Sequence, residues 1–440
     1  MRLLGKKKGQ SLLIVTIALV PMFGIVGLVT DLGYMYYVKK SAQNAADAAA
    51  MAAILQFQWG LGGSGAACGQ SGVVCQSATS CSPAPTNYLN SACLYATQNG
   101  FSASGNQSVT VAAGIGTPPT ASGVYSLGYW VTVRASQTVP QLFMSVMGVN
   151  NGTVAAEATA ATTPGRDCIW VMAPSGIGLS MNGTTTLSSS CGVFVDSNAS
   201  DALSGVGGAS LTASEIDIVG SYSWHGPISP DPPSTGLQAR PDPLAYLAEP
   251  STTGVTVRSS SQDTISKDTT LQPGIYVGGI YVKNATATLS AGTYIIEGGG
   301  VATQNANSVL QGSGVTIYNT CSTPGSCGSG SNYAPFSLSG NSTVALSAPT
   351  TGTYSGILIM EDRSIPVNTY YDTLGGGSSA QYTGIIYSPR SNVSMYGNAS
   401  ATVYTTMVAY TLSMVGTTYF NNDYSSLAGG NPLKVTALVE

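Results

Sequence analysis

A short charged stretch near the C-terminal end carries the side chains most suited to chemistry. Glu361, Asp362 and Arg363 follow the apolar run GILIM, and Asp372 and Arg390 come soon after. Sites that cleave polysaccharides cluster acidic and basic side chains on one face, where they can act as acid and base. Charged turns that close buried strands are common without any catalytic role. The sequence therefore favours a charged turn, and convergence of Asp362, Arg363 and Arg390 in one groove is the alternative.

The remaining polar residues offer no second catalytic pattern. The single histidine, His225, stands beside a proline-rich stretch, with no paired Ser or Cys pattern that it could activate. No G-x-S-x-G, phosphate-binding loop or dinucleotide fingerprint occurs, and no D-x-D-x-D run offers calcium ligands. We therefore predict no catalytic, cofactor-binding or metal-binding residue, and we expect that the protein is not an enzyme.

Eight cysteines lie beyond residue 67, an even number that is typical of disulfides in an oxidising compartment. Their local grouping suggests pairing within residues 68–93, of Cys168 with Cys191, and of Cys321 with Cys327. The sequence leaves the connectivity open. A zinc site is not expected, because no C-x-x-C spacing occurs and the chain has one histidine.

Charge is sparse and unevenly placed. Charged residues make up 8% of the chain, against roughly a quarter in an average soluble domain. Gly, Ser, Thr and Asn take their place, which favours a turn-rich β body with a neutral polar surface. Six of the fifteen basic residues and one of the nineteen acidic residues precede residue 41, which leaves nine basic and eighteen acidic residues beyond it. Such a body has no basic stripe, so nucleic-acid binding is not expected.

Residues 11–30, SLLIVTIALVPMFGIVGLVT, form an uncharged apolar run. Twenty residues at about 1.5 Å each match a hydrocarbon core of ~30 Å, so the run predicts a transmembrane helix with the lipid bilayer as its partner. Four basic residues precede it and predict a cytoplasmic tail over 1–10, with the body outside. Tyr34, Tyr36 and Tyr37 would form an aromatic belt at the outer interface. A cleaved signal peptide is the alternative, which the length of the run disfavours.

Residues 31–58 are rich in alanine and predict a continuation of the same helix. Ala42, Ala45, Ala49 and Ala52 recur at helical spacing and form one seam. An alanine seam buries little area, but it lets another backbone come close. The seam could pack within its own domain or against partner helices in an assembly, and the sequence alone leaves both open.

The N-terminal segment resembles a known family. Its matching features are Gly9-Gln10-Ser11, Pro21, Gly27, Asp31-Leu32-Gly33 and the run from Gln43 to Ala50. They are similar to the N-terminal segment of TadE/TadG-like proteins of the Flp (tight-adherence) pilus-assembly system. A type IV pilin would carry Glu where Ile14 stands, so polymerisation as a major pilin is not expected. Some TadG-like proteins resemble von Willebrand A domains, but Ala173 stands where the Asp of that metal motif should be.

The next stretches divide into a loop region and a small folded region. Residues 59–105 are rich in Cys, Gly and Ser and are predicted to be loop, whereas residues 106–163 resemble the small α/β region that follows in the same family. The residue pattern predicts strands over 108–113, 129–137 and 152–161, and a short helix from Pro140 to about Met147. Together with the N-terminal helix, this region predicts a pilin-like arrangement of one long helix against a small sheet.

Residues 164–440 contain a loose repeat, with copies such as LSMNGTTTLSS, LSGNSTVALSA and LSMVGTTYF. Gly and Asn suit the turns, and the flanking β-branched residues suit short strands. Stacked short strands of this kind predict a β-solenoid similar to a parallel β-helix, with a β-sandwich as the alternative. The density of proline predicts a long extended loop over 226–247.

These patterns together predict a membrane-anchored, mainly β protein with a transmembrane helix, a pilin-like α/β region and a C-terminal β-solenoid. The resemblance implies a structural or accessory role in a Flp/Tad-type pilus assembly or a related envelope adhesion apparatus. It implies pilus-assembly or other envelope proteins as partners through the alanine seam, and a single-pass location in the bacterial inner membrane with the body in the periplasm or outside. The alternatives are a surface adhesin or carbohydrate-binding solenoid, whose partner would be a glycan, and a membrane-tethered polysaccharide-acting enzyme.

Overall fold

The computed structural model describes most of the chain. The described residues are 10–61, 68–118, 128–328, 332–338, 341–375, 380–396, 399–400, 405–421, 423–427 and 431–439. The predicted tail over residues 1–10 therefore lies almost wholly outside the described residues. The described chain is one long apolar helix followed by a mostly β body, as the sequence predicts.

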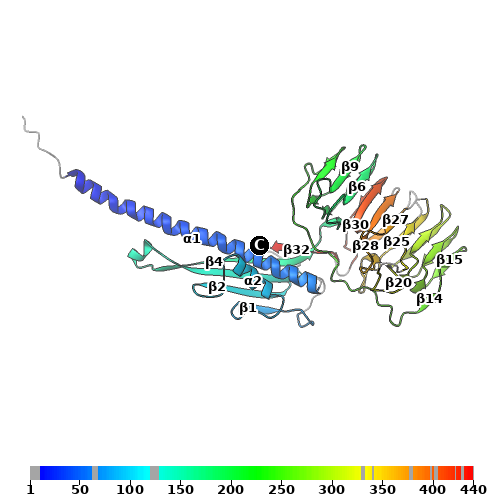
Figure 1. Ribbon diagram of the computed structural model, residues 1–440, viewed down its shortest axis with the longest axis horizontal. Helices are drawn as coiled ribbons and strands as arrows, with labels where there is room; N and C mark the ends of the chain where they lie inside the picture. Colours follow the sequence, from blue (N-terminus) through cyan, green and yellow to red (C-terminus); the bar gives the residue numbers. More distant parts are fainter. Residues whose placement is uncertain are drawn as a thin grey trace, which may run out of the picture. The chain divides into compact units, whose positions relative to one another are not determined.

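The chain forms two compact units (Figure 1). The first comprises Met1–Thr163 together with Lys434–Glu440, and the second comprises Pro164–Leu433. The predicted boundary of the last domain, 164–440, is corrected by this division, because the final strand returns to the first unit. The second unit is therefore an insertion between two neighbouring strands of the first unit's sheet.

The first unit is built on helix α1 (Gln10–Leu61), which runs unbroken for 52 residues. Alanine favours the helix in its C-terminal half, whereas the N-terminal half is apolar and includes Pro21, Gly24 and Gly27. At about 1.5 Å per residue it is roughly 78 Å long. Its C-terminal half packs on a sheet, whereas its described N-terminal part presents exposed apolar side chains.

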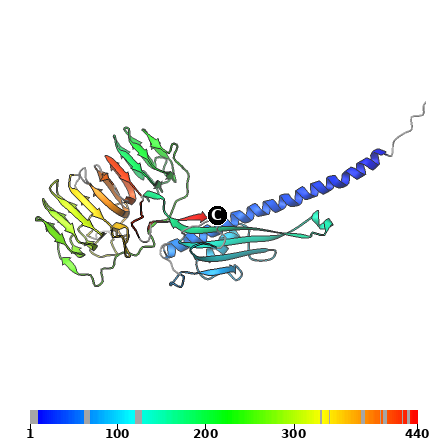
Figure 2. The ribbon, with the colours of Figure 1, turned by 180° about the vertical axis from the view of Figure 1, so that it is seen from behind.

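A five-stranded sheet lies against this half of the helix (Figure 2). The order is β1 (Gln76–Ser80), β2 (Gln107–Ile115), β3 (Tyr129–Pro140), β4 (Asn151–Pro164) and β32 (Lys434–Val439), with β1 to β4 antiparallel. Alternation places Val111, Val133 and Ala158 on the buried face, next to α1. The predicted strands are present, and the predicted short helix is the 3-10 helix η1 (Met144–Met147).

The predicted loop region 59–105 contains two regular elements, so this prediction is corrected. Strand β1 and helix α2 (Asn90–Gln98) lie within it. Ala92, Cys93 and Ala96 bury one side of α2 in the core shared with α1. Two disulfides, Cys68–Cys75 and Cys81–Cys93, hold the region, which settles the connectivity that the sequence left open. The short length and polar composition of these elements hid them from a reading based on periodicity.

The second unit is built from short strands whose described pairings are all parallel. From β5 to β13 and from β14 to β28, each strand lies beside the third strand before or after it, which produces three stacked ladders. The first ladder runs through β14 (Val257–Ser259), β17 (Gly274–Val277), β20 (Gly292–Glu297), β23 (Val315–Thr320), β26 (Ile357–Glu361), β28 (Gln381–Tyr396), β30 (Thr405–Val415), β5 (Asp167–Val171), β8 (Gly192–Val195) and β11 (Ile216–Ile218).

The other two ladders follow the same order. The second runs through β15 (Asp263–Ile265), β18 (Ile280–Val282), β21 (Val301–Thr303), β24 (Ser337–Leu338), β27 (Tyr371–Leu374), β28, β30, β6 (Leu179–Asn182), β9 (Leu203–Val206) and β12 (Tyr222–Trp224). The third ladder has two parts. The first part comprises β16 (Thr269–Leu271), β19 (Thr286–Leu289), β22 (Val309–Ser313), β25 (Thr343–Ser347) and the start of β28. The second part comprises β29 (Ala399–Ser400), β31 (Thr417–Phe420), β7 (Thr186–Ser189), β10 (Ser210–Thr212) and β13 (Ile228–Ser229).

Stacked apolar side chains fill the interior of the ladders. One column of paired residues runs through Ile317, Ile359, Ile386, Met407 and Ile169, and all five are buried. Glycine serves the corners between strands. Gly183 and Gly207 have φ angles of 70° and 75°, and a Cβ at Gly207 would lie 3.2 Å from the Gly183 backbone. Glycine at both positions lets the two corners stack closely.

The order of the turns in space differs from their order in the chain. Strand β30, near the end of the unit, pairs with β5 at its beginning, through Met407 and Ile169. The strands β5 to β13 thus extend from this junction in one direction, and β14 to β31 approach it from the other. Residues 230–256 connect β13 to β14, and we call them the crossing segment. The prediction of a long proline-rich loop over 226–247 agrees with this segment, apart from the two-residue strand β13.

Candidate functional site

The acidic residues of the charged stretch around Glu361 are closed to solvent. Glu361 ends strand β26 and is 1% exposed, Asp362 is 0% exposed and Asp372 is 1% exposed. Oε2 of Glu361 accepts a hydrogen bond from the Arg390 backbone N–H at 2.9 Å, and Oε1 accepts from the Tyr333 hydroxyl at 3.2 Å and from the Ser391 hydroxyl. These partners belong to the protein's own core. No face of this carboxyl group is left for a substrate.

Burial changes the protonation of this pair of acids. Desolvation, together with the nearby charge of Asp372, raises the pKa of Glu361 to about 8. Burial likewise raises the pKa of Asp372 to about 6, although the Phe336 backbone N–H donates to its Oδ1 at 2.8 Å and opposes the rise. The pair therefore holds a proton near neutral pH, inside the fold and away from the surface.

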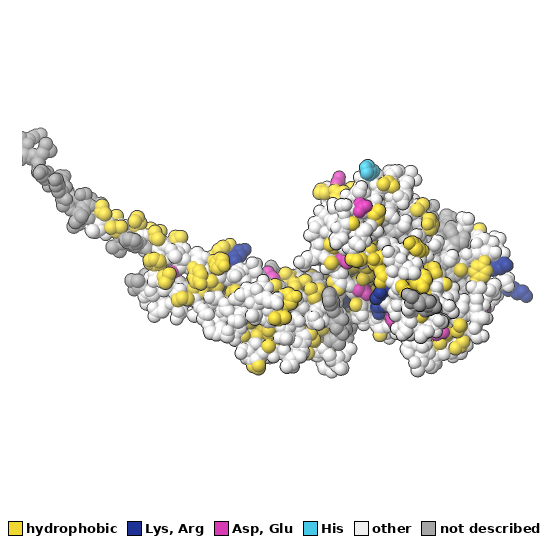
Figure 3. Space-filling view, in the orientation of Figure 1, with side chains coloured by type: hydrophobic (Ala, Val, Ile, Leu, Met, Phe, Trp, Pro, Cys, Tyr) yellow, Lys and Arg dark blue, Asp and Glu magenta, His cyan; other side chains and the backbone are white. Residues whose placement is uncertain are grey.

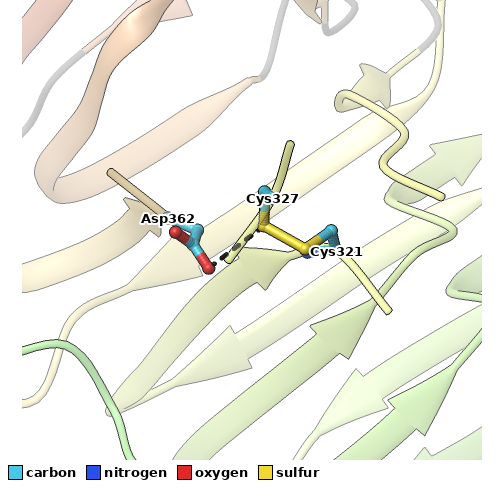
Figure 4. Close-up of side chains that lie close together, drawn as sticks. All are labelled: Cys321, Cys327 and Asp362. Atoms are coloured by element: carbon cyan, nitrogen blue, oxygen red, sulfur yellow. Dashed lines mark hydrogen bonds between the residues drawn. A yellow bond between two sulfur atoms is a disulfide. The ribbon is translucent and has the colours of Figure 1, made fainter. Parts of the chain in front are cut away.

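Asp362 lies beside the Cys321–Cys327 disulfide (Figure 4). Its Oδ2 accepts from the Thr320 hydroxyl at 2.6 Å and from the Gly325 N–H at 2.8 Å, and it lies 3.3 Å from Sγ of Cys327. Burial raises the pKa of Asp362, but hydrogen bonds from Ser364, Thr320 and Gly325 outweigh it and leave the pKa below its ordinary value. Two sulfurs and a carboxylate converge here as in a metal site. The sulfurs are bonded to each other, and a metal ligand would have to be a free thiolate.

Arg363 fastens the crossing segment to the ladders. Its Nη1 donates to the Leu247 carbonyl at 2.9 Å, its Nη2 to the Leu244 carbonyl at 2.7 Å, and its Nε to the Tyr387 hydroxyl at 2.6 Å. The guanidinium is thus committed to the crossing segment, whereas Asp362 is committed to the disulfide loop. The alternative in which Asp362, Arg363 and Arg390 line one catalytic groove finds no support in these contacts.

Arg240 makes a second fastening, from the crossing segment to the ladders. Its Nη1 lies 3.0 Å from Oδ2 of Asp167 and its Nη2 lies 2.6 Å from Oδ2 of Asp217. The guanidinium carbon sits 4.3 Å from the ring centroid of Phe194, and the backbone N–H donates to Oδ1 of Asp196 at 3.1 Å. Burial raises the pKa of Asp167 to about 7 despite the opposing charge of Arg240. Sequence reasoning missed this contact, because the partners lie in strands far from Arg240 in the chain.

His225 and the predicted disulfides can also be placed. The His225 side chain is exposed, and its backbone N–H donates to the Gly205 carbonyl as part of the ladder. The predicted pairs Cys168–Cys191 and Cys321–Cys327 are both formed. All eight cysteines are therefore paired.

The alanine seam of α1 faces the protein's own core. Ala42, Ala45 and Ala49 are 0% exposed and belong to the core formed with the sheet and α2, whereas Ala52 is partly buried. The prediction that partner proteins dock through this seam is corrected, because the sheet already covers it. Alanine permits the close approach of helix and sheet that burial at zero exposure requires.

Sequence reasoning also missed the contacts of Asp31, one of the residues that carried the family resemblance. Its Oδ1 accepts from the Leu142 N–H at 3.1 Å, and its Oδ2 accepts from the N–H groups of Phe143 and Met144 at 3.0 and 2.9 Å. The carboxylate thereby caps η1 at the turn between β3 and β4. A charged residue directly after an apolar run was the available signal, but its partners lie more than a hundred residues away.

Each unit has a groove that is open to solvent. One, of about 580 Å³, lies on the face of the first sheet away from α1, where Arg134 stands opposite Glu157 and Trp130 also lines the groove. The other, of about 540 Å³, runs along the third ladder and is lined by neutral polar side chains. In that row Gln311 donates to Thr288 at 3.0 Å, and Ser347 to Ser313 at 3.0 Å. These contacts join successive turns of the chain.

The long N-terminal helix and the small sheet packed on its C-terminal half are both present, as the sequence predicts. Residues 9–67 match the family model described as putative Flp pilus-assembly TadE/G-like, which confirms the resemblance seen in this segment. The match ends at residue 67, so the similarity of residues 106–163 to the same family stays a prediction. No curated protein and no solved structure matches the chain.

Proposed function

We propose that this protein is a structural component of a Flp/Tad-type pilus assembly or a related adhesion apparatus in the bacterial envelope. The observation that carries the proposal is the family match over residues 9–67. That segment contains the whole of α1, the element that joins the folded body to its apolar N-terminal part.

The exposed apolar side chains of α1 support its role as a membrane anchor. Within the described part of the chain, α1 is the helix that is long and apolar enough to cross a membrane. Ile17, Ile25 and Val29 are each 64–65% exposed, which is costly in water and favourable in lipid. Four basic residues before the apolar run favour a cytoplasmic N-terminus in the inner membrane. The body would then lie in the periplasm or outside.

We infer that the second unit is a β-solenoid that acts as a rigid spacer. The inference is supported by three ladders of parallel strands, since a β-sandwich would pair its strands mainly in antiparallel fashion. Two arginines and two disulfides fix the crossing segment and the turns. The closed acidic pair Glu361 and Asp372 supports a structural role for this unit rather than an enzymatic one.

The test is photocrosslinking in native membranes, with the reactive residue on the exposed face of α1. Asn44 is exposed, and a probe there should capture other pilus-assembly proteins or pilins. A probe at the buried Ala49 is the matched control, and it should give only crosslinks within the chain. If the Asn44 probe captured no such protein, and loss of the protein left surface pili unchanged, the proposed function would be wrong.

A carbohydrate-binding role is the second candidate, and the row along the third ladder favours it. Gln311, Ser313 and Ser347 lie in an open groove of neutral hydrogen-bonding groups, which suits the hydroxyl groups of a sugar chain. Replacing Gln311 and Ser347 by alanine should abolish retention on a glycan array. Equal retention by the unmodified and the doubly substituted protein would exclude this groove.

A further inference from the structure

The turn between β3 and β4 contacts α1 within the apolar run itself. We call residues 140–150 the hairpin tip. A Cβ at Gly27 would lie 2.4 Å from Cγ of Phe143, so the ring of Phe143 rests directly on the helix backbone. One helical turn further along, Asp31 holds the backbone of the tip. Figures 1 and 2 both show the end of this hairpin alongside α1.

The position of Gly27 fixes the depth of the tip. If residues 11–30 span the bilayer, Gly27 lies three residues before the end of the span, or about 4.5 Å inside it. A ring that rests on Gly27 must lie at the same level as the lipid that surrounds the helix. The tip therefore enters the zone between the headgroups and the acyl chains.

The side chains of the tip suit that zone. Leu142 is 69% exposed, Phe143 42% and Val149 43%, and no charged residue occurs between 140 and 150. Figure 3 shows hydrophobic side chains along the described N-terminal part of α1 and beside it. Three large apolar side chains at one turn, level with an exposed apolar helix, form a continuous surface with that helix.

The backbone of the tip also meets the condition that lipid imposes, which is that polar groups find partners within the protein. The Gln141 N–H donates to the Asn150 carbonyl at 2.9 Å, and the Val149 N–H donates to the Met144 carbonyl at 3.1 Å. Asp31 accepts from the three N–H groups at the start of η1, which have no partner within the turn. The one charge at this level is thus surrounded by donors.

We propose that the hairpin tip inserts into the outer leaflet beside α1 and forms a second contact with bilayer lipid. The inference rests on the proposed function of α1 as the anchor. Two contacts, a spanning helix and an inserted turn, fix the rotation of the body about the helix axis. Gly27 provides the space for this arrangement and Asp31 provides the attachment.

The test places an environment-sensitive fluorophore at single engineered cysteines in the full-length protein, reconstituted in phosphatidylethanolamine and phosphatidylglycerol vesicles. Labelling is specific because all eight native cysteines are paired. A probe at Leu142→Cys should be quenched by lipid that carries a nitroxide near the headgroup and protected from aqueous iodide. A probe at Ile25→Cys should behave in the same way, whereas Ser104→Cys, on the body, should respond to iodide alone.

The outcomes separate the two proposals. Quenching of position 142 by iodide alone, with position 25 quenched by lipid, would overturn the inserted tip and leave the anchor intact. Iodide quenching at both positions would overturn both. Protection of position 142 from both quenchers would mean that protein, not lipid, covers the tip, and would also overturn the inference.

A matched pair of substitutions gives a second readout. Leu142→Glu should lower lipid quenching of a probe at Val149→Cys at least threefold, because a charge in the interface opposes insertion. Leu94→Glu changes an equally apolar residue on α2 that is 51% exposed, and it should leave that quenching unchanged. Equal quenching in both variants would contradict insertion of the tip.

Discussion

Replacing Arg240 by alanine should release the crossing segment from the ladders. The substitution removes two ion pairs, with Asp167 at 3.0 Å and Asp217 at 2.6 Å, and the stacking on Phe194. It leaves the Asp167 side chain, which is 2% exposed, without its counter-charge. The crossing segment should then detach only around residue 240, because Arg363 still holds Leu244 and its neighbours.

The size of the effect follows from the exposure of the partners. A hydrogen bond to a charged group contributes about 1.5–3 kcal/mol, but the Arg240 side chain is 33% exposed and water screens part of each interaction. We therefore expect the free energy of local opening to fall by about 2 kcal/mol, which corresponds to a roughly 30-fold faster exchange of protected amides.

The effect should depend on pH in a defined direction. Burial raises the pKa of Asp167 to about 7, while Arg240 opposes the rise, so loss of Arg240 raises that pKa further. An acid whose pKa is higher in the folded protein favours folding at low pH and loses that contribution as pH rises through the folded value. The destabilisation by Arg240→Ala should therefore be largest near pH 8 and should shrink toward pH 5.

Hydrogen exchange measured by mass spectrometry checks this directly, on peptides that cover residues 236–248. Unmodified protein and variant are compared at each pH, so that the intrinsic exchange rate cancels. Arg258→Ala is the control, because Arg258 is exposed and its Nε donates to one carbonyl, that of Pro273, at 2.9 Å. Unchanged exchange in Arg240→Ala at pH 8, or an equal change in Arg258→Ala, would show that Arg240 does not hold the crossing segment.

Three further predictions concern the two cores. Ala49→Leu should destabilise the first unit by about 1–3 kcal/mol through overpacking, whereas Asn44→Leu on the exposed face should have little effect, as measured by thermal unfolding. Glu361→Gln should flatten the pH dependence of the free energy of unfolding. Because the pKa of Glu361 is raised to about 8, the unmodified protein loses roughly 4 kcal/mol of this free energy between pH 5 and 9. An amide cannot ionise, so the variant should not show this loss. Removing residues 434–440 should lower the melting temperature of the first unit alone, seen as a shift of one calorimetric transition, because β32 completes its sheet and Gln58 donates to the Lys434 carbonyl at 2.9 Å.

Local sequence patterns predicted much of the fold. The alternation of Val131, Val133 and Ala135 identified β3, and the apolar and alanine-rich runs identified α1, because burial on one face leaves a periodic trace in the sequence. Glycine in the repeat LSMNG marked a real corner at Gly183. The spatial order of the turns in the second unit left no periodic pattern in the sequence. It depends on the pairing of Met407 with Ile169, about 240 residues apart in the chain.

The candidate site was harder to predict, because its contacts also join residues that are far apart in the chain. The pattern of charged residues around Glu361 was visible and predicted a charged turn that closes a buried strand, but it did not predict that Glu361 itself is only 1% exposed. The direction in which Arg363 points was not visible, because its partners Leu244 and Leu247 belong to a segment more than a hundred residues earlier. For the alanine seam, composition showed that a close neighbour was needed but could not say whether that neighbour was the protein's own sheet.

The junction of β30 with β5 has a consequence for how the protein is made. Strands β5 to β13 leave the ribosome first, but β30 begins at residue 405, about 180 residues after β13 ends. At roughly 5–20 residues per second, the edge of β5 stays unpaired for about 10–35 s after β13 has been synthesised. An open strand edge recruits other strands. A chaperone that shields this edge until residue 420 has been synthesised would therefore raise the yield of correctly folded protein.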